Sequence, residues 1–490
     1  MIIIFYKVKD LSYIYYDEFM FWGTNLKTMF SYDLLWAEKS IDGIHLVYPP
    51  FTAIVEYIFC KINTIFSEGV TYFAIISLIL TSFLPIFKKE KYCIKSLIKI
   101  ILSILVVYFT INLFNYDLAN LSVDLILGVV FGVIMYLVYE ADNKKDYIVI
   151  SILMASITLM KPNGILFAGI GIMQLFFKKL FYSFLNRKSI TKKEIIKNFS
   201  GVFILLLLII STSLSWKTYY TLNGKKLDDR HDKNTTETIN VKEFINASLL
   251  NGKASKRNTQ ISRDFYKNIK EQQIIKKDSF NSCISILLIV NLIYLAILIL
   301  SKNKVKTISN FLSINIGWII YIYSNLLVFM FIFQKNQGEM LMGFDRYIAT
   351  YMLAMVLNLI FLVINKRNIL SFIAIIIYLL LIKSSYDKNI YRPEINNIIK
   401  ENAKIITENV KKDDKVFIID HKLDYGSEFV ATKYLISPIK TNLLYEWNIS
   451  QFDNNIYYRL SQTKEDFKNL LIEGKYDYIF IIYVNYTRNY

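Results

Sequence analysis

The sequence predicts a mainly α-helical, polytopic membrane protein: a helix bundle with interfacial helices in its first outer loop and a small C-terminal α/β domain. Of the 490 residues, 54% are hydrophobic and 16% are aromatic. The mean hydropathy of +0.36 is high for a soluble globular chain. Apolar runs long enough to cross or nearly cross a bilayer recur along most of the chain, and from about residue 385 the composition turns polar.

Charge and motif content exclude several function classes. The formal charge of +17 comes from basic residues that gather in short loops between apolar runs, which is typical of cytoplasmic loops and does not indicate nucleic-acid binding. The cysteines at 60, 93 and 283 are odd in number and far apart, so they predict neither a disulfide framework nor a zinc site. The sequence contains none of the usual motifs of nucleotide-driven transporters or of the common hydrolases.

Residues 1–69 are expected to form the first extracytoplasmic loop. Apolar side chains at helical spacing after Asp17 and Glu18 predict an amphipathic helix along the interface, and Pro49-Pro50 predicts the start of a second helix that runs to about residue 66. A chain that begins outside needs an earlier helix that leads outward, so we expect a transmembrane helix to be missing before residue 1. The alternative is an unusually short span within residues 1–16.

Residues 70–384 are expected to form a transmembrane bundle of about ten spans. The fourth and fifth are short for a bilayer core of about 30 Å, and Lys161-Pro162-Asn163-Gly164 divides them, so a buried, broken hairpin is an alternative to two lipid-facing helices. The expected spans are 70–87, 96–114, 121–139, 147–160, 164–177, 200–218, 282–300, 308–333, 346–364 and 369–384.

The distribution of lysine predicts the orientation of the bundle. If the segment before residue 70 lies outside, every short basic loop falls on the cytoplasmic side. The polar loop 219–281, which shows no strong periodicity, then lies outside. So does the C-terminal domain 385–490, where 416–419 and 478–482 are expected as buried strands and 464–471 as a helix.

Asp17 and Glu18 are the most informative polar residues, because carboxylates at a bilayer boundary are costly and are usually functional. The structural alternative is that they cap the amino end of the interfacial helix.

Several motifs together resemble the GT-C membrane glycosyltransferases, which include protein O-mannosyltransferases and aminoarabinose transferases that use polyprenyl-phosphate sugars. The acidic pair, Trp22, Lys27 and Tyr48-Pro49-Pro50 are similar to the first outer loop of that family. The resemblance continues along nearly the whole chain, and the absent first helix departs from the family pattern. The further stretches that carry it are Val123-Asp124-Leu125, Leu159 to Gly164 and Phe344 to Tyr347.

The resemblance implies a general base in the acidic pair, with Asp17 as the candidate and Glu18 as the alternative. Loss of a lipid phosphate calls for a cation at the membrane edge, and Arg346 and Lys161 fit this role as donor-phosphate ligands. Their structural alternatives are a snorkelling arginine and an interface anchor. Asp124 either binds the acceptor, supports a catalytic lysine or forms a buried ion pair.

Tyr48, Trp22 and His45 are candidate acceptor-binding or supporting residues. At an interface the two aromatic residues are also typical of a membrane belt, and a lone loop histidine is typical of a surface. We expect no metal and no cofactor, although the acidic pair leaves a divalent ion open.

The sequence therefore predicts a multi-pass cell-membrane glycosyltransferase that takes a sugar from a polyprenyl-phosphate carrier, on the extracytoplasmic face. The acceptor is a cell-envelope glycan, lipid or protein, and membrane lipid is the further partner. Two alternatives remain: a non-catalytic polyprenyl-lipid transporter or flippase, and a truncated inactive homologue.

Overall fold

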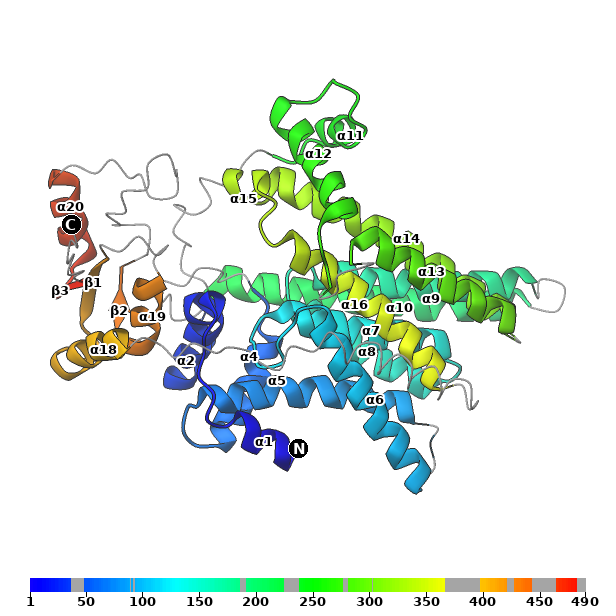
Figure 1. Ribbon diagram of the computed structural model, residues 1–490, viewed down its shortest axis with the longest axis horizontal. Coiled ribbons are helices and arrows are strands. Elements are labelled where there is room, and N and C mark those ends of the chain that lie inside the picture. Colours follow the sequence, from blue (N-terminus) through cyan, green and yellow to red (C-terminus); the bar gives the residue numbers. More distant parts are fainter. Residues whose placement is uncertain are drawn as a thin grey trace.

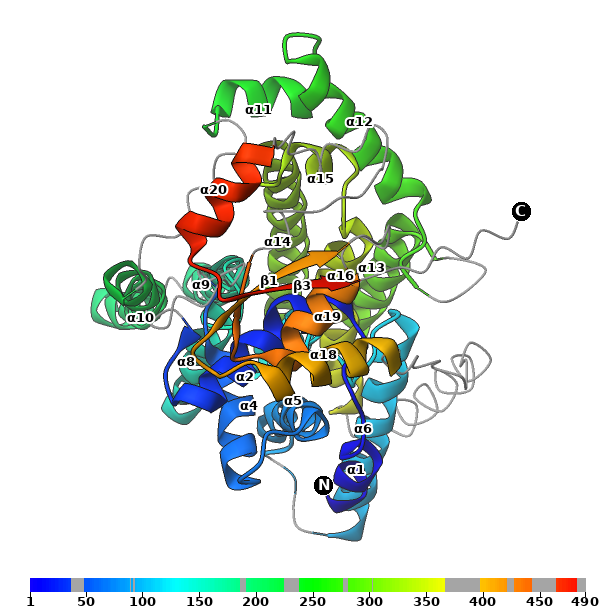
Figure 2. The same cartoon turned by 90° about the vertical axis from the view of Figure 1, so that its left-hand side faces the viewer.

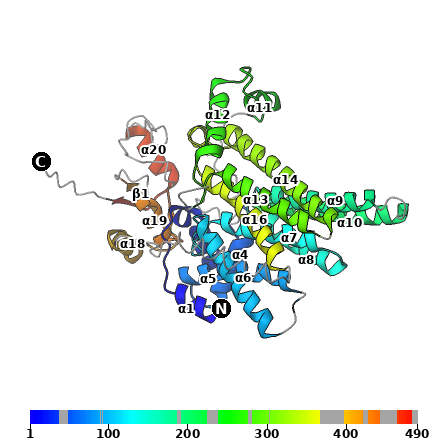
Figure 3. The same cartoon turned by 45° about the vertical axis from the view of Figure 1, so that its right-hand side comes forward.

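The computed structural model describes residues 1–36, 48–88, 90, 93–185, 191–223, 238–275, 281–301, 303–365, 397–420, 427–442 and 464–482. A bundle of long helices occupies one part of the molecule, and a small sheet with short helices lies at one end of it (Figures 1 and 3). The expected fold class, a polytopic helix bundle with a small C-terminal α/β domain, is confirmed.

Eight helices among the described residues are long and apolar enough to cross a membrane. They overlap eight of the ten expected spans. The run 147–160 forms the 15-residue helix α8 (Lys144–Thr158), about 22 Å long and thus short for a bilayer, and 369–384 falls outside the described residues. The eight spans are Glu68–Phe87, Ser96–Leu113, Val123–Glu140, Gly164–Phe184, Phe199–Asn223, Cys283–Leu300, Lys304–Phe331 and Phe344–Ile364.

The spans belong to helices whose bounds extend past the apolar windows in places. They are α5 (Glu68–Phe83) with the 3-10 turn η2 (Leu84–Phe87), α6 (Ile94–Leu113), α7 (Val123–Glu140), α9 (Gly164–Leu185), α10 (Lys192–Asn223), α13 (Cys283–Leu300), α14 (Lys304–Phe331) and α16 (Phe344–Ile364).

Helix α7 forms the centre of the bundle. Its side chains are buried from Val123 to Val138, as expected for a helix that is apolar on all sides. It packs against α16, α9, α8 and α5, and the contact with α16 is the most extensive between any two described elements. The position of α7 therefore determines where the ends of its neighbours meet.

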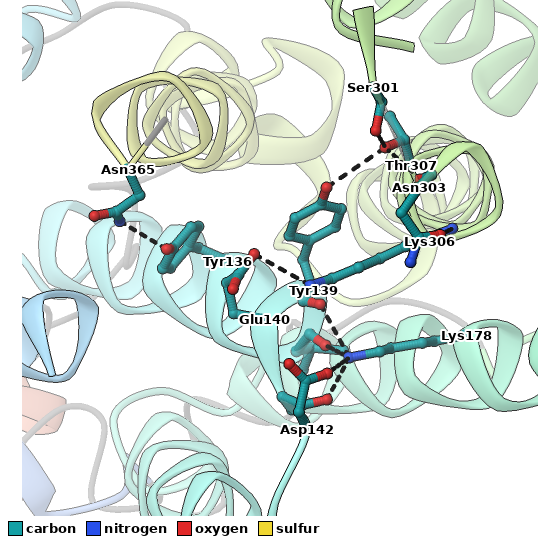
Figure 4. Close-up of polar contacts among 12 residues, drawn as sticks. Tyr136, Tyr139, Glu140, Asp142, Lys178, Ser301, Asn303, Lys306, Thr307 and Asn365 are labelled. Atoms are coloured by element: carbon teal, nitrogen blue, oxygen red, sulfur yellow. Dashed lines mark hydrogen bonds and ion pairs between the residues drawn. The ribbon is translucent and has the colours of Figure 1, made fainter. Parts of the chain in front are cut away.

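At the carboxy end of α7, two lysines bind the last backbone carbonyl groups of the helix and a carboxylate (Figure 4). The Lys178 ammonium donates hydrogen bonds to the backbone oxygens of Val138 (3.0 Å) and Tyr139 (2.9 Å), which have no partner within the helix. Lys306 pairs with Glu140 at 3.1 Å. These lysines come from the predicted basic side of the bundle, and the amino ends of α7 and α16 lie at its other end.

Short helices precede the first span. They are α1 (Ile2–Val8), the π-helix η1 (Glu18–Trp22), α2 (Gly23–Tyr32) and α4 (Phe51–Ile62). The interfacial helix expected after the acidic pair corresponds to η1 and α2, and the helix expected after Pro49-Pro50 corresponds to α4.

The polar loop 219–281 contains two helices, α11 (Val241–Ser248) and α12 (Lys256–Glu271), where the sequence predicts no strong periodicity. On α12 the buried positions 258, 261, 262 and 265 do follow helical spacing. Asn and Ser occupy two of them, so a search for apolar residues misses the pattern. The short helix α15 (Lys335–Glu339) lies between α14 and α16.

The C-terminal domain contains a parallel sheet of three strands in the order β2-β1-β3. Both expected strands and the expected helix are present, as β1 (Lys415–Asp420), β3 (Tyr478–Ile482) and α20 (Lys464–Gly474). The structure adds β2 (Lys440–Thr441), α18 (Asn397–Asn409) and α19 (Ser427–Ile436). Helix α19 faces the bundle (Figure 1).

Candidate functional site

Helices α7 and α16 run parallel and in close contact because α7 carries glycine where they touch. A Cβ atom on Gly128 would lie 2.7 Å from the backbone oxygen of Thr350, and one on Gly132 would lie 3.0 Å from that of Ala354. Small residues four apart allow such an approach between membrane helices. Asp124 lies one turn before Gly128, and Arg346 lies one turn before Thr350, so the same contact brings these two side chains together.

Four charged side chains form a continuous chain at this end of the bundle, and we call them the charged tetrad: Asp17, Arg346, Asp124 and Lys161. Arg346 Nη1 donates to Asp17 Oδ2 at 3.0 Å. Arg346 Nε lies 3.1 Å from Asp124 Oδ2, and Lys161 Nζ donates to Asp124 Oδ1 at 2.6 Å. Positive and negative groups alternate, and the formal charges balance.

Lys161 reaches Asp124 from the turn between α8 and α9. The Gly164 amide donates to the Lys161 backbone oxygen at 2.8 Å and closes this turn. The Phe51 amide, at the start of α4, donates to the Leu159 oxygen at 2.9 Å and fixes the first outer loop beside it. Burial is the largest single influence and lowers the pKa of Lys161, but the Asp124 carboxylate together with Tyr347 and Tyr48 outweighs it, so the pKa is raised and the ammonium stays charged.

The two acidic residues of the first loop occupy different environments. Asp17 lies at the start of η1, and its side chain is 35% exposed and faces Arg346. Glu18 is fully buried. It accepts hydrogen bonds from the backbone amides of residues 14, 15 and 121 and from the hydroxyl of Tyr72 at 2.9 Å.

Burial raises the pKa of the Glu18 carboxyl, and these hydrogen bonds oppose the shift. Glu18 therefore joins three segments of the fold, whereas Asp17 is partly exposed.

Aromatic rings border the tetrad. The ring centroid of Tyr347 lies 4.9 Å from Lys161 Nζ and 5.5 Å from the Arg346 guanidinium carbon, within the range of cation–π contacts. Burial raises the pKa of the Tyr48 hydroxyl, while nearby Lys161 lowers it. Trp22 and Tyr48 meet edge to face at 5.0 Å.

The structure thus brings together most of the site residues predicted from the sequence. Asp17, Arg346, Asp124 and Lys161 are in direct contact, and Tyr48 and Trp22 are adjacent to one another. Glu18 is buried beneath the first outer loop and holds it to residues 72 and 121 through hydrogen bonds. His45 lies outside the described residues. No group of three His, Cys, Asp or Glu side chains suited to a metal ion occurs in the described part of the chain, and metal independence stays a prediction.

Sequence reasoning missed two residues near the site. Tyr347 belongs to a quoted motif but received no role, although its place directly after Arg346 was a signal. Glu56 on α4 is only 3% exposed. Burial, followed by the charge of Glu18, raises its pKa well above the usual value. Its i, i+4 spacing with Thr52 and Cys60, both buried, marks the inner face of α4.

The C-terminal domain packs directly on the first loop. Lys27 Nζ donates to the backbone oxygens of Tyr434 (2.9 Å) and Leu435 (2.8 Å), at the carboxy end of α19. The Tyr434 hydroxyl donates to Glu68 Oε1 at 2.5 Å. Because α19 also packs on η1, the domain contacts the segment that follows Asp17.

Comparison with known proteins gives one distant likeness. No protein-family profile and no curated protein matches the chain by sequence. A crystal structure of ArnT from Cupriavidus metallidurans bound to undecaprenyl phosphate is similar, with a TM-score of 0.40 and 9% identity over 98% of this chain and 88% of that one. ArnT is a GT-C aminoarabinose transferase, the group that the sequence motifs resemble. So distant a likeness carries no conclusion about the reaction, and the function rests on the site.

Proposed function

We propose that this protein is a membrane glycosyltransferase that transfers a sugar from a polyprenyl-phosphate carrier to a cell-envelope acceptor on the extracytoplasmic face. The observation that supports this most directly is the 3.0 Å contact between Asp17 and Arg346. It places a partly exposed carboxylate and a guanidinium side by side where apolar spans begin. A lipid-linked phosphate needs a cation at that depth, and a hydroxyl nucleophile needs a base beside it.

The reaction requires one proton acceptor and one site for a departing phosphate. The acceptor hydroxyl oxygen forms a bond to the anomeric carbon, and its proton passes to the Asp17 carboxylate. The bond between the anomeric carbon and the phosphate oxygen breaks, and the electron pair leaves with the lipid phosphate. Arg346 stabilises the charge that grows there. Inversion at the anomeric carbon is implied by the family resemblance alone.

Donor binding and base activation are coupled in this proposal. Arg346 holds Asp17 through Nη1, and its Nη2 group makes no hydrogen bond within the described segments. An arriving phosphate binds that free edge and competes with Asp17 for the guanidinium. Once displaced, Asp17 is available to the acceptor hydroxyl. The resting ion pair therefore keeps the base occupied until a donor is present.

Asp124 and Lys161 act as positioning residues. Asp124 is buried and bridges both cations, so it orients Arg346 from the side opposite Asp17. Lys161 shares the neutralisation of the buried Asp124 carboxylate with Arg346. In this proposal Arg346 is the donor-phosphate ligand, and Lys161 contributes through Asp124 rather than by direct contact.

The test measures transfer of labelled sugar from a panel of polyprenyl-phosphate sugars into envelope acceptors, with the protein in membranes. Both the chain as given and an upstream-extended form are assayed. Asp17→Asn is expected to lower transfer about 10²- to 10⁴-fold, the usual range for a general base, with donor binding retained. The matched control is Asp345→Asn, which removes an exposed carboxylate beside Arg346 and should leave transfer unchanged.

Arg346→Ala should weaken donor binding by about 10- to 150-fold, the equivalent of losing a charge-assisted contact of roughly 1.5–3 kcal/mol. Equal loss of transfer in the Asp17 and Asp345 variants would contradict the assignment of Asp17. Donor binding without transfer in any form would instead support the lipid transporter.

A further inference from the structure

Helix α11 and the residues on either side of it expose aliphatic side chains, while Glu243, Phe244 and Ala247 face the protein. Glu243 accepts hydrogen bonds from the Ser255 amide at 2.8 Å and from Asn258 Nδ2 at 3.0 Å, so it faces α12. The outward residues are Ile239, Val241, Ile245, Leu249 and Leu250, with exposed fractions from 40% to 68%. A surface helix in water shows the opposite arrangement.

The position of α11 beside a span indicates what covers this face. The Phe244 ring lies 6.5 Å from the ring of Tyr323 on α14, and the Tyr266 hydroxyl of α12 donates to the Ser248 oxygen at 2.9 Å. Tyr323 is seventeen residues beyond Lys306, or about 26 Å along the helix. With Lys306 at one edge of a hydrocarbon core of about 30 Å, Tyr323 lies near the opposite edge.

The direction of α11 agrees with this depth. In Figure 1 the spans run across the view and α11 is seen almost end-on, whereas Figure 2, which looks from the end that carries the C-terminal domain, shows α11 lengthwise and α10 end-on. Helix α11 is thus roughly perpendicular to α10, as a helix lying in the plane of a membrane must be. Lys242 on the helix and Lys253 and Lys256 beyond its carboxy end are exposed and suit the phosphates of lipid headgroups.

We propose that α11 is an interfacial anchor whose aliphatic face inserts into the outer leaflet beside α14. The occupant of this face is the bilayer, because the ring contact with Tyr323 holds α11 at headgroup depth. Lipid covers the five aliphatic side chains, and the hydrogen bonds of Glu243 face α12. The anchor fixes the otherwise polar segment between the spans α10 and α13 at the membrane surface, at the same end of the bundle as the charged tetrad.

Spin-label accessibility in lipid nanodiscs tests the anchor on the full chain. A nitroxide is attached at Ile245→Cys in a Cys93→Ser background, since Cys60 and Cys283 are buried. Leu292→Cys on the lipid-facing side of α13 is the lipid reference, and Lys404→Cys on α18 is the aqueous reference. We expect the label at 245 to collide with oxygen as often as the one at 292 and to be shielded from a water-soluble nickel chelate.

Two results overturn the proposal. Nickel-chelate collisions at 245 equal to those at 404 would place the helix in water. Shielding from both reagents would show that protein, such as a second copy of the chain, covers this face. A label at Ser248→Cys, on the side that faces α12, gives the pattern expected for protein cover and distinguishes the second result.

Discussion

At the scale of single residues, Asp17 and Glu18 show how adjacent carboxylates acquire different roles. They are neighbours in sequence, yet one faces a guanidinium at the surface of the site and the other accepts hydrogen bonds from the preceding turn and from two distant segments. No local pattern distinguishes them, because the burial of Glu18 depends on its partners at residues 72 and 121, which lie far away in the sequence.

The role of Glu18 leads to a prediction about stability. In Glu18→Gln an amide group replaces an oxygen that accepts hydrogen bonds, so at least one donor is left buried without a partner. We expect a loss of about 1–3 kcal/mol in the free energy of unfolding. Thermal unfolding in detergent, compared with Asp17→Asn, checks this. A Glu18 variant as stable as the Asp17 variant would contradict the scaffold role.

Glu56 predicts a dependence of stability on pH. Its pKa in the folded protein is raised well above the unfolded value, chiefly by burial. Glu56 therefore binds a proton more tightly in the folded state than in the unfolded state. The stability that this difference contributes is fully present below the pKa of Glu56 in the unfolded state. As pH rises from that value to the folded pKa, each unit costs about 1.4 kcal/mol.

Glu56→Gln removes this titration. We expect its unfolding temperature to exceed that of the wild type at pH 8 and to approach it at pH 5. Parallel unfolding curves across this range would show that Glu56 is not the titrating group.

At the scale of elements, the contact of α7 with α16 sets the geometry of the site. Gly128→Leu should force the helices apart at Thr350, lower the unfolding temperature and weaken donor binding, since Arg346 and Asp124 lose their register. Gly169→Ala on α9 is the control, because a Cβ atom there meets nothing within 4 Å. Thermal unfolding and donor binding are measured for both. Unchanged donor binding in Gly128→Leu would show that this contact does not position Arg346.

At the scale of the whole molecule, the C-terminal domain is held against the first loop by Lys27 and Tyr434. Burial lowers the pKa of Lys27 to about 8, with Glu68 opposing, so the contact uses a largely desolvated ammonium. Lys27→Met leaves the carbonyl groups at the end of α19 without their donor. We expect a cost of about 1–3 kcal/mol in docking and faster amide exchange in α19.

Lys404→Met is the matched control for this change, because among the described residues Lys404 pairs only with Glu408 on α18, at the surface, and such pairs contribute little. Equal exchange rates in α19 of the two variants would exclude Lys27 as a docking contact.

The sequence by itself determined the membrane class, most of the spans, the separation of basic loops from the acidic motif and the residues of the charged tetrad. The first three features depend on local composition and on the high cost of charge near hydrocarbon, and the tetrad residues are named by the resemblance of their motifs to the GT-C family. Only the tertiary structure decided that Asp17 rather than Glu18 faces Arg346, that Lys161 pairs with Asp124 and that aliphatic side chains on and beside α11 are exposed. Each of these depends on contacts between segments far apart in the chain, which periodicity within one segment does not encode.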